Sequence, residues 1–196
     1  MPTAVPVSHA TEVCVVGIDE AGRGALAGPV VAAACILPAL ETFPVRIGDS
    51  KQMSEEERAI ASRWLIQNCV HGIGLVEAEE IDRIGILAAN EIAMQQAVLQ
   101  VARTHHNLYL LVDGRDKFWF DHPHSSIIRG DESELCIGAA SILAKVARDK
   151  KMTALRRKFP RFAFEKHKGY GTPEHFAEIK KYGMCDVHRR SFLKNL

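Results

Sequence analysis

The chain has 196 residues, 47% of them hydrophobic and 25% charged, and its net charge is +1. This composition is typical of a globular domain with a buried core, and because there is neither a run of about 18 apolar residues nor a secretory signal at the start, we expect a cytoplasmic protein without a membrane span. Its five cysteines form no C-x-x-C pair, which favours reduced thiols over disulfides or a zinc site.

The first part of the chain alternates apolar runs with turns and one helix. Residues 1–12 contain two prolines and predict a short loose tail. Residues 13–19 and 30–37 are apolar runs that predict buried strands, with a glycine-rich turn between them. A Ser-x-x-Glu capping box predicts a helix over residues 54–68, and a third strand is expected at residues 72–76.

The second part is richer in helix formers. Residues 79–103 predict a helix with a break near Gly85. Residues 108–113 and 126–128 predict a fourth and a fifth strand, and residues 138–159 predict a long helix.

The end of the chain carries a clear start and stop signal for one more helix. Thr172-Pro173 is typical of an N-cap followed by proline at the first helical position, and Gly183 is typical of a helix end. Because strands come first and helices follow, we expect an α/β layer fold with a mixed sheet and a helical C-terminal part.

Charge is distributed unevenly along the chain. Residues 1–144 contain 10 basic and 19 acidic residues, whereas residues 145–196 contain 15 basic and 5 acidic residues. This asymmetry favours an acidic site beside a basic surface that binds a polyanion such as nucleic acid. The alternative is a basic helix face that is merely solvated.

Acidic residues stand at the ends of predicted strands. Asp19 and Asp113 each end an apolar strand, and Asp131 follows the fifth one. If the strands are neighbours, about 4.8 Å apart, these carboxylates project from one edge of the sheet. Glu20 can join Asp19 only if the strand bends there, because adjacent side chains point to opposite faces; the glycines that follow at positions 22 and 24 favour such a bend.

A carboxylate cluster of this kind needs cations, because its members repel one another. Oxygen ligands favour Mg²⁺ or Mn²⁺, and two such ions about 3.5–4 Å apart can hold a phosphodiester in line with an attacking water. The alternative is that these acids are turn formers, caps and solvated loop residues. No zinc-binding or serine hydrolase motif is present.

The glycine turn has two interpretations. Residues 22–27 formally match the dinucleotide-binding fingerprint G-x-G-x-x-G/A, but Gly28-Pro29 would fall inside the helix that the fingerprint requires. The other interpretation is that Gly22 and Gly24 let the backbone approach a ribose 2′-OH closely, with Arg23 meeting a phosphate.

Several stretches resemble one enzyme family. Residues 17–24 (GIDEAGRG) are similar to the signature of ribonuclease HII, the type 2 ribonuclease H. Type 3 enzymes carry Ser and Lys where this chain has Ala21 and Arg23, so type 2 fits better. Further stretches follow in the order of the family: residues 49–53 (DSKQM), 112–114 (VDG), 130–131 (GD), 139–146 (AASILAKV), 167–172 (HKGYGT) and 188–192 (HRRSF).

The resemblance implies an α/β ribonuclease H-like fold, with a mixed five-stranded sheet flanked by helices and a C-terminal helical extension. It implies one domain over residues 1–196, with the catalytic core at about 13–159 and the extension at about 160–196. It also implies that four acids hold Mg²⁺ or Mn²⁺ and carry catalysis: Asp19, Glu20, Asp113 and Asp131.

The implied activity is that of an endonuclease acting on nucleic acid as a monomer. It hydrolyses the RNA strand of RNA/DNA hybrids and cuts 5′ to single ribonucleotides in duplex DNA, leaving 3′-OH and 5′-phosphate ends, in ribonucleotide removal from DNA and RNA primer removal. Gly22, Arg23 and Gly24 read the 2′-OH, Tyr170 stacks on the neighbouring deoxyribose, and Lys51 contacts a phosphate.

Two residues and one competing function remain open. Ser141 and Lys145 share a helical face and either approach the substrate or serve as packing and capping partners. The competing function is a duplex-binding module without catalysis.

Residues 184–187 (MCDV) depart from the family pattern of Gly, Pro and small residues, and residues 191–196 lack a recognisable clamp-binding motif.

Overall fold

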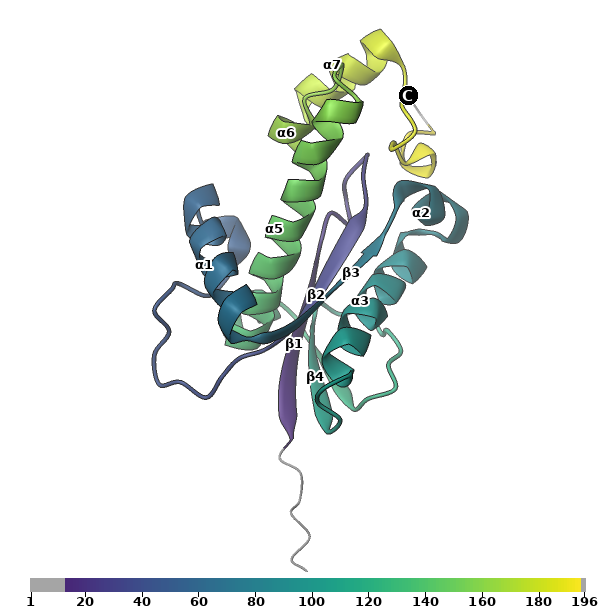
Figure 1. Cartoon of the computed structure of the whole chain (residues 1–196). Coiled ribbons are helices and arrows are strands. Elements are labelled where there is room, and N and C mark those ends of the chain that lie inside the picture. The colour runs from purple at the N-terminus through teal and green to yellow at the C-terminus, as the bar shows by residue number, and fades with distance from the viewer. Residues whose placement is uncertain (1–12, 195–196) are drawn as a thin grey trace, which may run out of the picture.

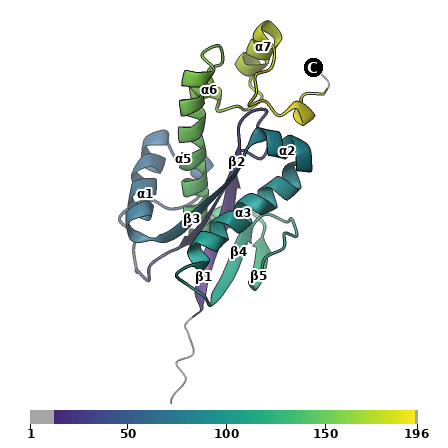
Figure 2. The same cartoon turned by 45° about the vertical axis from the view of Figure 1, so that its right-hand side comes forward.

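The computed structural model describes residues 13–194, so the loose tail expected at residues 1–12 lies outside the described residues. A five-stranded mixed sheet with the order β3-β2-β1-β4-β5 forms its centre (Figures 1 and 2). β1 is antiparallel to β2 and parallel to β4, which confirms the expected mixed sheet. The strands are β1 (Cys14–Ala21), β2 (Val30–Ile36), β3 (Val70–Val76), β4 (Leu108–Asp113) and β5 (His124–Ile127).

Helices cover both faces of this sheet (Figure 1). α1 (Glu55–Asn68) and α5 (Leu135–Lys158) cover one face, and α2 (Ala78–Ile84) and α3 (Ile86–Ala102) lie on the other side. Each side has its own buried apolar cluster. No helix within residues 13–194 combines the length and the apolar character needed to cross a bilayer.

Side-chain alternation in β1 and β4 decides which acid faces which helix. Val16 and Ile18 pack in the apolar cluster that contains α3, as does Val112 of β4. Because successive side chains alternate, Asp19 and Asp113 point to the other side, toward α5. Glu20 shares the α3 side with Ile18.

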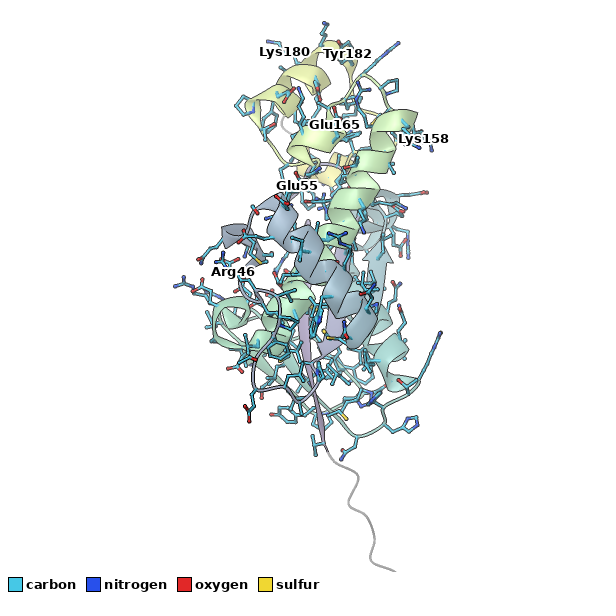
Figure 3. The ribbon with its side chains drawn as sticks, turned by 60° about the vertical axis from the view of Figure 1, so that its left-hand side comes forward. Arg46, Glu55, Lys158, Glu165, Lys180 and Tyr182 are labelled. Atoms are coloured by element: carbon cyan, nitrogen blue, oxygen red, sulfur yellow. The ribbon has the colours of Figure 1, made fainter. Side chains whose placement is uncertain are left out.

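The C-terminal segments pack at the far end of α5. They are α6 (Phe164–His167), α7 (Pro173–Tyr182) and the short 3₁₀ helix η2 (Arg190–Phe192), around a third buried cluster that includes Phe164 and Ile179. Figure 3 shows Lys158 and Lys180 extending from this end of the molecule. This part confirms the expected C-terminal helical extension.

The extension closes back on the turn between β1 and β2. Leu26 N–H donates to the Gly169 carbonyl at 2.8 Å, and a bridge joins Ala27 to His188. Asp82 of α2 accepts hydrogen bonds from the backbone N–H groups of Arg190 and Ser191. The departure from the family pattern at residues 184–187 therefore does not prevent the chain from returning to the core.

Several predicted boundaries need correction. β5 covers residues 124–127 rather than 126–128, because it is a half-exposed edge strand without an apolar run to mark it. Asp131 does not end a strand; it lies in the first turn of α4 (Gly130–Ser133), after Arg129 turns the chain with a φ of 58°. α5 begins at Leu135 instead of residue 138.

The turn after β1 rules out the dinucleotide-binding interpretation. That fingerprint needs a helix starting at the glycines, but the chain enters β2 instead. The expected capping boxes and stops hold elsewhere: Ser54 caps α1 with a complete capping box, Gly85 separates α2 from α3, and Thr172 caps α7.

Candidate active site

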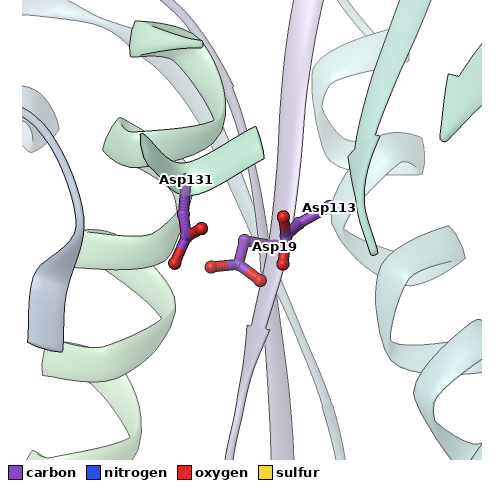
Figure 4. A group of neighbouring side chains, drawn as sticks. All are labelled: Asp19, Asp113 and Asp131. Carbon is purple, nitrogen blue, oxygen red and sulfur yellow. The ribbon is translucent and has the colours of Figure 1, made fainter. Parts of the chain in front are cut away.

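Three acids far apart in sequence meet at one edge of the sheet. Asp19, Asp113 and Asp131 each offer a carboxylate oxygen, and these oxygens lie within 4.8 Å of one another (Figure 4). The parallel pairing of Ile18 with Val112 sets the first two acids side by side. Gly130 N–H donates to Asp113 Oδ1 at 2.7 Å, which brings α4 and its Asp131 to the same edge.

Glu20 does not belong to that trio of carboxylates. β1 continues regularly to Ala21, so the expected bend between Asp19 and Glu20 is absent and the strand ends after both. Glu20 lies 3.7 Å from Arg23 Nη1 and near the fully buried Asn90 of α3. It still lines the same pocket as Asp19, and therefore reaches the site from the other face of the sheet.

The electrostatics of the site oppose ionisation of its acids. Burial, followed by the charges of Glu20 and Asp113, holds the pKa of Asp19 well above its usual range. Burial and then Asp131 raise the pKa of Asp113, and burial also raises the pKa of Glu20. Carboxylates that share a site in this way are stabilised by a cation, so this set of oxygen donors fits a divalent metal.

Lys51 lies next to the acidic group and is exposed to solvent. Lys51 lies in the 3₁₀ helix η1 (Ser50–Gln52), whose N-cap Asp49 accepts from Lys51 N–H. Its Nζ lies 3.2 Å from Asp131 Oδ2, although the side chain is 78% exposed. The ammonium thus compensates part of the negative charge while remaining accessible to a ligand.

The acids form one side of a pocket of about 450 Å³. The glycine turn forms another side, and Tyr170 of the C-terminal extension also lines the pocket. Twelve residues from five separate stretches of sequence line the pocket: Asp19, Glu20, Ala21, Gly22, Arg23, Gly24, Ser50, Lys51, Asp113, Ser141, Lys145 and Tyr170.

The two residues left open by the sequence have defined contacts. The Ser141 hydroxyl is buried, lies 2.9 Å from the Ser50 hydroxyl, and lowers the pKa of Asp19, against the larger effect of burial. Lys145 Nζ forms an ion pair with Asp149 at 2.9 Å and lies 5.7 Å from the centre of the Tyr170 ring. Both therefore line the pocket and also have partners within the protein.

Two polar residues of the site were missed in the sequence. Asp116 accepts from Arg23 Nη1 at 2.6 Å and so holds the middle residue of the glycine turn. Asn90 opposes the rise in the pKa of Glu20, although no hydrogen bond of normal length joins the two. The available signal for Asn90 was a polar residue on the buried face of a predicted helix.

Comparison with known proteins decides the family. The sequence model described as Ribonuclease HII matches residues 16–195. The chain belongs to the ribonuclease HII family. Ribonuclease HII of Endomicrobium trichonymphae is 46% identical over 179 residues, which cover 91% of this chain and 84% of that protein. Ribonuclease HII of Chlamydia muridarum is 44% identical over 182 residues, covering 91% and 81%.

Solved structures of ribonucleases H share the fold. Ribonuclease H2 of Pyrococcus horikoshii has a TM-score of 0.69 at 25% identity, covering 90% of this chain and 92% of that one. Ribonuclease HII of Archaeoglobus fulgidus, solved in complex with PCNA, has a TM-score of 0.71 at 23% identity, covering 90% and 93%. Bst-RNase HIII, solved with Mn²⁺, has a TM-score of 0.63 at 15% identity, covering 98% and 68%.

Membership of the ribonuclease HII family confirms the predicted class of enzyme. This protein is a ribonuclease H, a metal-dependent nuclease that acts on nucleic acid. The type 2 assignment made from Ala21 and Arg23 is confirmed, and the competing function of a duplex-binding module without catalysis is wrong.

Proposed function

We propose that this ribonuclease HII hydrolyses the RNA strand of RNA/DNA hybrids and incises duplex DNA 5′ to single ribonucleotides, leaving 3′-OH and 5′-phosphate ends. The observation that carries this proposal is one pocket lined by an acidic group, a glycine turn and an aromatic ring. In this proposal the acids catalyse hydrolysis, the glycine turn selects ribose, and the Tyr170 ring selects the RNA–DNA junction. The proposed cellular role is to remove ribonucleotides from DNA and to remove RNA primers, and we propose that the protein acts as a cytoplasmic monomer.

The acids are the proposed metal ligands and catalytic residues. Asp19, Asp113 and Asp131 would hold Mg²⁺ or Mn²⁺ through their clustered oxygens, and Glu20 would join from the far side of β1. A pair of such ions, held by these residues, would supply polarisation of the phosphodiester and a lowered pKa of the attacking water. The protein's own part is to keep the carboxylates gathered against their mutual repulsion, which the Gly130–Asp113 hydrogen bond and the Ser141 hydroxyl support.

The glycine turn is the proposed reader of the ribose 2′-OH. A Cβ built on Gly24 would meet no heavy atom within 4 Å, so nothing inside the protein requires glycine there. Close approach of a ligand to the backbone is the proposed reason for glycine at this position. Arg23, which forms ion pairs with Asp116 and Glu20, is the proposed partner of a phosphate beside the ribose.

Tyr170 and three polar residues complete the proposed substrate contacts. The Tyr170 ring faces the pocket and offers a surface for stacking on the deoxyribose at an RNA–DNA junction. Lys51 is the proposed phosphate ligand, because its ammonium is exposed to solvent although it forms an ion pair with Asp131. Ser141 is better placed to support Asp19 than to touch substrate, and Lys145 is proposed to approach the backbone beside Tyr170.

The direct test is incubation with a DNA duplex that carries one ribonucleotide, in Mg²⁺ or Mn²⁺, followed by mapping of the nick. We expect a single cut on the 5′ side of the ribonucleotide and none in the all-DNA duplex or in chelator. A cut on the 3′ side, or equal cutting of the all-DNA duplex, would overturn the proposal. An RNA/DNA hybrid incubated in parallel tests the other substrate.

A further inference from the structure

Arg148, in the middle of α5, is a fully buried arginine that joins two distant segments of the chain. Its Nε donates to the Pro29 carbonyl at 2.9 Å and its Nη2 to the Ala27 carbonyl at 3.1 Å. Its Nη1 donates to the Lys168 carbonyl at 2.9 Å. Each guanidinium nitrogen thus holds one main-chain carbonyl, two in the segment between β1 and β2 and one in the segment that precedes Tyr170.

The same guanidinium contacts both walls of the pocket. Its Cζ lies 5.0 Å from the centre of the Tyr170 ring, within the range of a cation–π contact. A Cβ built on Gly22 would lie 1.8 Å from its Nε, so the Cα of Gly22 packs directly against the guanidinium. Arg148 itself does not line the pocket, so it acts from behind the residues that do.

We propose that Arg148 is a positioning residue for substrate selection, which sets the spacing between the glycine turn and the Tyr170 ring. The inference rests on the proposed function, in which the turn reads the ribose and the ring reads the next sugar. The ribose and the next sugar are contacted at the same time only when the glycine turn and the Tyr170 ring are the correct distance apart. Arginine suits this position because its planar fork offers several donors and a flat face, whereas lysine offers a single point charge.

The backbone around Tyr170 shows why such support is needed. Lys168 and Gly169 both have positive φ, 49° and 80°, so the segment that carries the ring is a sharp turn. For the non-glycine Lys168 this left-handed conformation is unfavourable. The hydrogen bond from Arg148 to the Lys168 carbonyl holds that residue in place.

The test compares kcat/KM on a duplex with one embedded ribonucleotide and on a long RNA/DNA hybrid. Arg148→Met should reduce kcat/KM on the first substrate about 10- to 100-fold, the loss expected when a reacting group is displaced slightly, and on the hybrid by less. Adding Tyr170→Ala to Arg148→Met should produce little further loss, because both changes remove the same element.

Arg189 provides the matched control. It is also a fully buried arginine and donates to the carbonyls of Gly28 and Arg23, but its guanidinium lies against Phe192. Losses from Arg189→Met and Tyr170→Ala should multiply. If the losses from Arg148→Met and Tyr170→Ala multiply in the same way, or if Arg148→Met affects both substrates equally, the positioning role is wrong.

A second measurement separates this proposal from the proposed function. Amide hydrogen exchange at residues 168–171 in the substrate-free protein should become at least about tenfold faster in Arg148→Met and change little in Arg189→Met. Unchanged exchange would overturn the role of Arg148 even if cleavage is normal. If the wild type does not incise at a ribonucleotide, the proposed function fails and the exchange result alone decides the role of Arg148. If Arg148→Met does not fold, Arg148→Lys replaces it with the same expected directions.

Discussion

The Nε2 atoms of His175 and His188 lie 3.0 Å apart within the buried part of the C-terminal extension. His188 Nδ1 accepts from Cys185 N–H at 2.9 Å, so the His188 proton lies on Nε2 and is donated to His175. His175 in turn donates from Nδ1 to the Tyr170 carbonyl at 2.9 Å. Both imidazoles are therefore neutral, and a single chain of hydrogen bonds ends at the residue proposed to meet the substrate.

This pair predicts a loss of stability in acid. Burial, above all, lowers the pKa of His175 to about 4, from 6.5, and lowers that of His188 as well. Below pH 6.5 the unfolded chain binds protons that the folded protein excludes, so this contribution to stability is complete above pH 6.5 and is lost as the pH falls toward 4. The free energy of unfolding should decrease by up to about 1.4 kcal/mol per pH unit for each histidine.

Urea unfolding at pH 7, 6 and 5 measures the effect. The free energy of unfolding of His175→Gln should depend less on pH than that of the wild type. Because the acidic residues titrate in both proteins, their contribution cancels in this comparison. His106→Asn, at an exposed position, should leave the slope unchanged. Equal slopes in wild type and His175→Gln would disprove the prediction.

Replacement of Asp113 should remove activity and preserve the fold. Asp113→Asn removes a carboxylate that burial and Asp131 hold above its usual pKa, so the protein without metal should be no less stable. Loss of a metal ligand costs several kcal/mol, and each 1.4 kcal/mol is about tenfold in rate, so cleavage should decrease at least about 100-fold. The measurements are kcat in saturating Mg²⁺ and the melting temperature in chelator.

Asp121→Asn is the control for this prediction, because Asp121 is an exposed acid outside the pocket. It should retain wild-type activity. An Asp113→Asn protein with more than a tenth of wild-type activity would contradict the proposed ligand role.

Gly24→Ala should separate recognition from folding. Since an added Cβ meets no protein atom, the free energy of unfolding should stay within about 1 kcal/mol of wild type. Cleavage at a ribonucleotide should decrease at least about tenfold, because the methyl group occupies the space proposed for the ribose. Gly48→Ala, where a Cβ also meets nothing but which lies outside the pocket, should change neither quantity. Wild-type cleavage by Gly24→Ala would exclude close backbone approach at this residue.

Tyr170→Ala should impair cleavage at a single ribonucleotide more than cleavage of a long hybrid. Stacking on an aromatic ring contributes about 1–3 kcal/mol, so we expect kcat/KM at the junction to decrease roughly tenfold or more. Tyr182→Ala removes an exposed tyrosine of the same extension and should affect both substrates little. Equal losses on the two substrates would remove the stacking role of Tyr170.

The pair Asp19 and Asp113 could be predicted because strand ends are local features and parallel neighbours share an edge. Asp131 could be named but not placed, since its position depends on the left-handed turn at Arg129. Glu20 was expected beside Asp19 through a bend, whereas the regular strand sends it to the opposite face. Arg148 was beyond prediction, because its partners lie 20, 119 and 121 residues away in the sequence.

Glu20 and Asp19 are neighbours on one strand that look out from opposite sides of the sheet. A substrate served by both would therefore reach the end of the sheet at which the backbone of β1 stops. Because Ser141 and Lys145 of α5 also line the pocket, the helical layer on the Asp19 side contributes to the site together with the end of β1.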